Sequence, residues 1–349
     1  MSLGTRGRSG AFPGGHPAGP GVSRHFPPAF SLGEKSVAPV IRHHSRCLRE
    51  HDKNGRAARG HGAYGGRAVS ARLRGIAQRT EQIVAAGAYR APDGSEVSIA
   101  AELRAAREGT RLYGPRPVPV PADRVTGVRA TRCEVTGESS LEAARRLGGH
   151  VAVLNFASAR NPGGGYLNGA QAQEEALCRA SALYACLLEA RAFYDHHRAH
   201  RDPFYTDRVI HSPAVPVFRD DRGGLLAEPY TAGFLTSPAP NAGVVHRTAP
   251  DRAVELPRAL AARAERVLET AAANGYRRLV LGAWGCGVFR NDPAQVAEAF
   301  RALLTPGGRF AQAFERVVFG ILDRTRDRAV LGAFEKTFSS SRSAPAGGV

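Results

Sequence analysis

Apolar runs separated by polar breaks divide most of the chain into short segments. Residues 150–156 are apolar at almost every position, which is typical of a strand buried on both faces. Other segments also have strand character: 129–135, 208–218, 233–240, 277–284 and 315–322. Two of them, 208–218 and 233–240, contain prolines, which confine a strand to a sheet edge or to its ligand-facing end.

Apolar residues that recur every three or four positions predict helices between these strands. In residues 173–188 such a stripe continues along one predicted helix and consists of Leu177, Ala180, Tyr184, Leu187 and Leu188. Further helices are predicted at 69–89, 99–107, 140–147, 253–273, 293–304 and 326–338. Strands that alternate with helices from residue 150 to 338 predict an α/β fold with a mixed sheet.

The domain organisation follows from where these patterns begin and end. Residues 1–66 are rich in Gly, Pro, Arg, Ser and His without periodicity, so they cannot bury enough apolar surface to fold. We expect a disordered extension at 1–66, a small helical accessory region at 67–125, a core at 126–338 and a disordered tail at 339–349. Because Met1 is the only methionine, we also expect the functional protein to start downstream of it.

The net charge of +17 is unevenly distributed. Residues 1–70 carry 11 basic and 3 acidic side chains, so almost half of the excess lies outside the predicted core. The basic residues are mostly Arg among many Ala, Gly and Pro, which favours a GC-rich genome as the origin of the charge. No stripe of basic and aromatic residues is present, so no direct nucleic-acid partner is predicted.

Cysteine and histidine patterns predict no metal site. None of the five cysteines forms a CxxC pair, and Cys178 and Cys186 are predicted to be small buried residues. His196, His197 and His200 lack a spaced acidic or cysteine partner, so we expect a solvated helix face. No 18-residue apolar run and no secretory h-region occur, and we expect a cytoplasmic protein without a membrane partner.

A glycine loop follows the buried strand at 150–156. Three glycines, Gly163, Gly164 and Gly165, leave the backbone free to bend and open to close approach. Seven residues later, Gln173, Glu174 and Glu175 open the predicted helix. Since ligands bind at the carboxyl ends of strands in open α/β sheets, the two carboxylates are expected at a ligand site. Each feature alone also has a structural explanation, because acidic residues complement the dipole of a first helical turn.

A second glycine loop, 285–291, lies between the strand at 277–284 and the helix at 293–304. Two such loops facing each other can bind a pyrophosphate through backbone N–H groups. The loop does not match the dinucleotide fingerprint GxGxxG, since Arg290 occupies the third glycine position, and the chain contains no GK[ST] P-loop. A Rossmann-type enzyme is therefore disfavoured.

The spacing of the three glycines and Gln-Glu-Glu resembles the signature of bacterial-type poly(ADP-ribose) glycohydrolases, which have a macrodomain core. Residues 155–162 and 176–187 are similar to the same group, and the resemblance covers about residues 69–340. It implies a macrodomain-like three-layer α/β/α fold that hydrolyses ribose–ribose O-glycosidic bonds and releases ADP-ribose. It also implies no metal or redox cofactor, with poly(ADP-ribose) or ADP-ribose as ligand and ADP-ribosylated proteins as partners.

The resemblance also implies roles for single residues. Glu175 is the expected general acid/base, Glu174 the residue that holds the ribose hydroxyls, and Gln173 a residue that fixes the loop. The implied substrate-binding residues are Gly163, Gly164, Gly165, Gln173, Gly285, Cys286, Gly287, Val288, Phe289 and Asn291. Many bacterial members of the family have a glycine where this chain has Arg290.

Some features of the predicted site have two interpretations. The dipole of a helix N-terminus lowers the pKa of Glu175, whereas a general acid needs a raised pKa, which desolvation or the charge of Glu174 can supply. Phe289 lines the ligand cleft or packs within its loop. Trp284 ends a buried strand and is expected in the core, and Cys286 is expected to be a small residue rather than a nucleophile. A reader that binds ADP-ribose without cleaving it needs the loops but not the paired glutamates.

Overall fold

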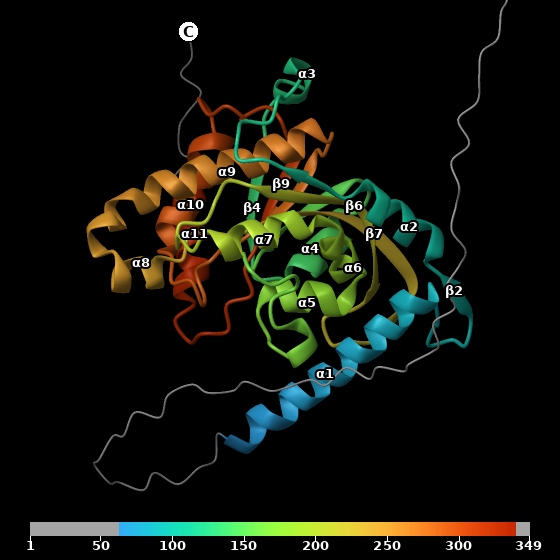
Figure 1. Cartoon of the computed structure of the whole chain (residues 1–349). Coiled ribbons are helices and arrows are strands. Elements are labelled where there is room, and N and C mark those ends of the chain that lie inside the picture. The colour runs from blue at the N-terminus through green and yellow to red at the C-terminus, as the bar shows by residue number, and fades with distance from the viewer. Residues whose placement is uncertain (1–62, 340–349) are drawn as a thin grey trace, which may run out of the picture. The chain divides into compact units, whose positions relative to one another are not determined.

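One seven-stranded sheet organises residues 63–339, the part of the chain that the computed structural model describes (Figure 1). The strand order is β3-β6-β7-β5-β8-β9-β4, with β5 in the centre. β5, β7, β8, β9 and β4 are parallel, whereas β6 is antiparallel to both β7 and β3. The strands are β3 (Arg111–Tyr113), β4 (Arg132–Thr136), β5 (Val151–Phe156), β6 (Val209–Arg219), β7 (Leu225–Ser237), β8 (Arg278–Leu281) and β9 (Arg316–Gly320). The predicted α/β fold with a mixed sheet is confirmed.

Helices cover both faces of this sheet. One face packs against α1 (Ala63–Ala86), α2 (Ala100–Gly109), α4 (Ser140–Leu147), α5 (Gln173–Ala180), α6 (Leu183–Leu187) and α7 (Arg191–Ala199). The other packs against α9 (Leu256–Ala273), α10 (Pro293–Leu304) and α11 (Ala329–Ser339), coloured orange to red in Figure 1. The remaining elements of residues 63–339 are two short helices, three 3-10 helices and a hairpin: α3 (Ala122–Val125), α8 (Ala242–Thr248), η1 (Tyr166–Asn168), η2 (Leu188–Ala190), η3 (Pro250–Glu255), and β1 (Ala88–Arg90) with β2 (Glu96–Ser98). The predictions for residues 1–62 and 340–349 lie outside the described residues.

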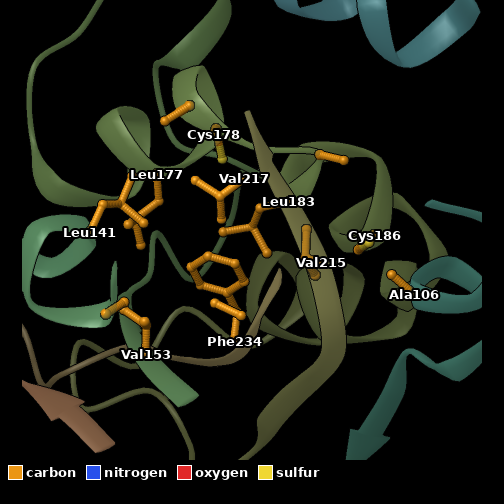
Figure 2. Packing of buried hydrophobic residues seen from close by; sticks show 14 of the residues in the cluster. Ala106, Leu141, Val153, Leu177, Cys178, Leu183, Cys186, Val215, Val217 and Phe234 are labelled. Carbon is orange, nitrogen blue, oxygen red and sulfur yellow. The ribbon is translucent and has the colours of Figure 1, made fainter. Parts of the chain in front are cut away.

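The central strand β5 connects the two halves of the core. Val151 and Val153 pack on the side of α4 and α5, whereas Ala152 and Leu154 pack on the side of α9 and α10, as side chains alternate along a strand. Figure 2 shows Val153 among Leu141, Leu177, Val217 and Phe234, which come from four other elements. This burial on both faces explains why the sequence of β5 is apolar throughout except at Asn155.

The prediction of one helix over residues 173–188 is wrong, because the helix breaks at Ser181. Ser181 forms a β-bridge with Val217, and the Ala182 N–H donates to the carbonyl of Pro216 at 3.0 Å. Strand β6 therefore takes backbone hydrogen bonds that a continuous helix would have made internally. The prolines that enable this contact lie where expected, in the part of β6 beyond its pairing with β3.

The expectation of a solvated histidine face is wrong for one of the three histidines. His197 is fully buried, and its ring nitrogens contact the Phe193 carbonyl at 2.9 Å and Thr206 Oγ1 at 2.8 Å. Burial lowers its pKa to about 4. His196 and His200 stack outside it with ring centroids 4.1 Å apart.

Parallel pairing brings the segments with unusual sequence to one edge of the sheet. The carboxyl ends of β5, β7, β8 and β9 point the same way, so the loops that follow them gather there. These loops are 157–172, 238–241, 282–292 and 321–328. Both glycine loops belong to this set, and β5 and β8 are direct neighbours. The fold thus places the two loops side by side, as a ligand crevice in an α/β sheet requires.

Candidate active site

The first glycine loop packs directly against the two glutamates of α5. Gly163 and Gly164 have φ values of +64° and +59°, in the left-handed region that favours glycine. A Cβ on Gly164 would lie 2.5 Å from Glu175 Oε1 and 3.2 Å from Glu174 Oε2. A Cβ on Gly165 would lie 2.7 Å from that of Ala170. The glycines are therefore needed both for the turn and for the close approach of the carboxylates.

Glu175 is held by one of its oxygens and free at the other. Its residue exposure is 8%, and the Gly165 N–H donates to Oε1 at 2.8 Å. Oε2 is buried and has no hydrogen-bond partner among the described residues. Buried polar atoms are nearly always paired, and leaving one unpaired costs about 1–3 kcal/mol. The loop thus orients Glu175 and leaves one oxygen available.

Glu174 is more deeply buried and fully engaged. The Ser158 N–H donates to its Oε2 at 2.7 Å, and Asn155 Nδ2 donates to its Oε1 at 3.3 Å. Burial raises the pKa of Glu174 to about 8, against the opposing effect of these hydrogen bonds and with a further rise from the charge of Glu175. Without a ligand, Glu174 is therefore mostly protonated at neutral pH.

Asn155 is a site residue that the sequence analysis missed. Its Nδ2 bridges Glu174 and Thr236 Oγ1, which lies on the neighbouring strand β7. The sequence contains a feature that could have identified it, because Asn155 is the one polar residue in the apolar sequence VAVLNF of β5. A polar residue inside a doubly buried strand must have a partner, and here that partner is a glutamate of the site.

Gln173 joins the first turn of α5 to the sheet. Its Oε1 accepts the Phe156 N–H at 2.9 Å, and its Nε2 donates to the Leu154 carbonyl at 2.8 Å and to Ser140 Oγ at 3.0 Å. Both ends of the amide are thus occupied by protein groups. These bonds connect α5 to β5 and α4 and not to the glycine loop, and they leave little of the side chain for a ligand.

The second glycine loop is closed by an amide instead of a carboxylate. Asn291 is 3% exposed, and its Nδ2 donates to the carbonyls of Pro240 at 2.8 Å and Gly285 at 3.1 Å. The outer part of the loop is open: a Cβ on Gly287 would meet nothing within 4 Å, and Val288 is 82% exposed. The ring of Phe289 lies 5.9 Å from that of Tyr205 and is half-buried.

Three other residues of this loop bear on the predictions. Arg290 has a φ of +57°, so this chain places an arginine in a conformation that favours glycine. Burial raises the pKa of the Cys286 thiol to about 12, which leaves little of the thiolate that a nucleophile needs. Trp284 is buried, as expected, and its Nε1 donates to the Ser237 carbonyl at 2.9 Å.

A cavity of about 540 Å³ lies at the carboxyl edge of the sheet and extends from α5 to the second glycine loop. Its wall includes Gln173, Phe156, Cys286 and Gly287. Glu174 and Glu175 do not line it, because they face the first glycine loop on the other side of the first turn of α5. Its lining also includes the polar and charged residues Ser139, Ser140, Arg179, Asp221, Asp323 and Arg324.

No group of three or more His, Cys, Asp or Glu side chains among residues 63–339 is arranged to hold a metal ion. None of the helices formed by these residues combines the length and apolar character needed to cross a membrane.

The fold and the crevice define an α/β protein of macrodomain type whose candidate ligand site contains a buried pair of glutamates. Residues 77–220 match the family model for the catalytic domain of microbial-type PARG. No curated protein matches the chain.

Solved structures extend the comparison. Poly(ADP-ribose) glycohydrolase from Thermomonospora curvata is 50% identical, with a TM-score of 0.72 over 77% of this chain and 100% of that one. The same enzyme bound to the inhibitor ADP-HPD is also 50% identical, with a TM-score of 0.69 over 76% and 99%. The glycohydrolase from Deinococcus radiodurans in complex with ADP-ribose is 46% identical, with a TM-score of 0.62 over 68% and 97%.

The chain belongs to the bacterial poly(ADP-ribose) glycohydrolase family. The predicted macrodomain-like fold and the predicted glycosidase activity are confirmed at this level. The roles of individual residues stay predictions.

Proposed function

We propose that this glycohydrolase cleaves the ribose–ribose bond at the Glu174–Glu175 pair, with the released ADP-ribose unit bound between the two glycine loops. The observation that carries the proposal is the buried, unpaired Oε2 of Glu175 beside a glutamate whose pKa is raised. The complexes of related enzymes with ADP-ribose and with ADP-HPD support ADP-ribose as the ligand.

Glu175 acts as the general acid and then as the base. Cleavage passes through an oxocarbenium-like transition state, in which the leaving oxygen needs a proton. The Gly165 N–H holds Oε1, so Oε2 is the oxygen that carries the proton to the leaving group. The resulting carboxylate then takes a proton from the attacking water.

Glu174 holds the ribose hydroxyls next to the bond. Its carboxylate is fixed by Ser158 and Asn155, so a sugar bound to it is presented in a constant position. Constant positioning lowers the barrier because the entropy of alignment is already lost on binding.

The second loop and the cavity bind the rest of the unit. The open backbone around Gly287 offers N–H groups to the pyrophosphate, and Val288 and Phe289 cover the ribose. A cavity of about 540 Å³ lies within the usual range for small-ligand sites and takes the nucleoside. Gln173 and Asn291 are positioning residues, because their side chains bond to protein groups. ADP-ribosylated proteins are the source of the polymer.

Comparison of wild type with Glu175→Gln tests the catalytic role. The amide keeps the shape of the side chain but cannot supply the proton, so kcat on poly(ADP-ribose) should fall by about 10²- to 10⁴-fold. Affinity for ADP-ribose, measured by calorimetry, should stay within about threefold. A matched Glu142→Gln variant, on the exposed end of α4, should leave both unchanged. If Glu175→Gln retains wild-type kcat, the assignment is wrong; if wild type binds ADP-ribose but releases none, the protein is a reader.

A further inference from the structure

A second cavity, of about 560 Å³, lies at the opposite edge of the sheet from the candidate active site. It is lined by Arg129, Arg132, Arg278 and Arg316, and we call it the arginine cavity. Glu315 is the one acidic residue in its wall, so the formal charge of the lining is +3. Arg132, Arg278 and Arg316 are the first residues of β4, β8 and β9, whose carboxyl ends lead to the active-site loops.

The three strand arginines form a ladder. Arg132 pairs in register with Arg316, and Arg316 pairs in register with Arg278. Neighbouring strands lie about 4.8 Å apart, so the three residues span about 10 Å and project from the same face. Like charges directly opposite each other destabilise a sheet. An anion bound across the ladder would remove this repulsion.

The cavity is built from fixed backbone. The Thr131 N–H donates to the Ala311 carbonyl at 2.7 Å, and Thr131 Oγ1 donates to the Phe310 carbonyl at 2.8 Å, which anchors the chain between Arg129 and Arg132. Arg278 Nη1 donates to the carbonyls of Leu147 and Gly148 at 3.0 and 3.3 Å. The guanidinium of Arg278 is therefore held in place before any ligand binds.

Charge compensation at the arginine cavity is incomplete. Arg316 pairs with Glu134 at 2.9 Å, and Arg278 pairs with Glu315 at 3.5 Å. Arg129 and Arg132 are exposed and form no ion pair with any residue from 63 to 339. Arginine presents planar, always-charged donors that suit phosphate oxygens. Arg129 and Arg132 are thus available to bind an anionic ligand.

We propose that the arginine cavity binds phosphate groups of poly(ADP-ribose) away from the bond that is cleaved, an inference that rests on the proposed function. Strands β4, β8 and β9 run from the arginine cavity to the edge that carries the candidate active site. Each has at most five residues, so the two edges are separated by roughly 15 Å. A unit bound at the active site does not reach the arginine cavity, but a chain of several units does. Contact at both edges makes the second binding event intramolecular and favours long chains.

The test removes the two free arginines. In Arg129→Gln/Arg132→Gln, KM for long polymer should rise about 3- to 10-fold, because two charge contacts with the polymer are lost. The kcat on long polymer and both constants on a two-unit oligomer should stay unchanged. The slope of log KM against log salt should fall by about 1–2, which a general loss of folding would not produce.

The control variant Arg116→Gln/Arg258→Gln removes the same charge from exposed arginines without ion pairs in the described part of the chain. It should behave as wild type. Equal effects of the two double variants, or equal effects on long and short substrates, would overturn the proposal.

A direct measurement of polymer binding tests the arginine cavity independently of the catalytic role proposed for Glu175. In a Glu175→Gln background, fluorescence anisotropy with labelled long polymer should show the same 3- to 10-fold loss of affinity in Arg129→Gln/Arg132→Gln. This result would stand even if wild type proved inactive on the polymer. If the double variant loses affinity for single-stranded DNA and none for the polymer, the cavity is a nucleic-acid site and the proposal is wrong.

Discussion

The two glycine loops at the carboxyl edge of the sheet are closed in different ways. The first is closed by acidic side chains, since Gly165 donates to Glu175 and Ser158 donates to Glu174. The second is closed by the neutral amide of Asn291, which donates to two carbonyls. The first is packed so that no Cβ fits at Gly164, whereas Gly287 in the second has open space around it. In the proposed mechanism, the reacting groups therefore lie beside the closely packed first loop, and the ligand covers the second loop, which is open to solvent.

The largest effect that separates the two loops is expected from adding one methyl group to each. Gly164→Ala places a Cβ 2.5 Å from Glu175 Oε1 and forces a left-handed residue that costs about 1–2 kcal/mol. We expect kcat to fall by about 10²-fold or more, because small displacements of reacting groups have effects of this size. Gly287→Ala is the matched control and should change kcat by less than about threefold. Similar losses in the two variants, measured by steady-state kinetics, would remove the contrast between the loops.

The next largest effect concerns the pH dependence of stability. Glu174 keeps its proton up to a pKa of about 8 in the folded protein, whereas the unfolded chain releases it near 4.5. The stabilisation from this group is therefore complete below pH 4.5 and is lost as the pH rises to 8, at up to about 1.4 kcal/mol per pH unit. In Glu174→Gln this loss should disappear. Chemical denaturation of both proteins from pH 5 to 8 checks the prediction.

The measurement that isolates Glu174 is the difference in unfolding free energy between wild type and Glu174→Gln at each pH. Burial lowers the pKa values of His197 and His211 to about 4, so both histidines destabilise the fold as the pH falls below 6.5. They do so equally in the two proteins. Parallel curves of unfolding free energy against pH would show that Glu174 titrates normally in the folded state.

A smaller effect is expected at the closure of the second loop. Asn291→Ala removes both hydrogen bonds of Nδ2 and leaves the carbonyls of Pro240 and Gly285 without this donor. We expect a loss of about 1–3 kcal/mol in unfolding free energy and a several-fold weaker affinity for ADP-ribose, with kcat nearly unchanged. Thermal unfolding and calorimetry measure the two quantities. A fall in kcat as large as that of Gly164→Ala would show that the second loop also positions the reacting groups.

The smallest effect is expected at the tip of the second loop. Val288 is 82% exposed, so Val288→Ser should change the unfolding free energy by no more than about 0.5 kcal/mol. If ligand binding covers this side chain, affinity for ADP-ribose should fall about two- to fivefold, from the apolar area that is no longer buried. Unchanged affinity would mean that the ligand leaves the tip uncovered.

Local features of the chain were predictable because they depend on neighbouring residues. The apolar run of β5, the left-handed turn at Gly163 and Gly164, and the start of α5 at Gln173 are all set within about 25 residues. The break at Ser181 was not predictable, because it depends on Val217, 36 residues further on. The burial of His197 likewise depends on Thr206, which the helical pattern of α7 does not include.

The sequence by itself determined that a buried strand leads through three glycines to two glutamates, and that a second glycine loop follows another buried strand. Only the tertiary structure decided that β5 and β8 are neighbours, that Asn155 donates to Glu174, and that three arginines align across β4, β9 and β8. The reason is strand register: it is fixed by packing between residues far apart in the chain, and a shift of one residue would send each side chain to the other face.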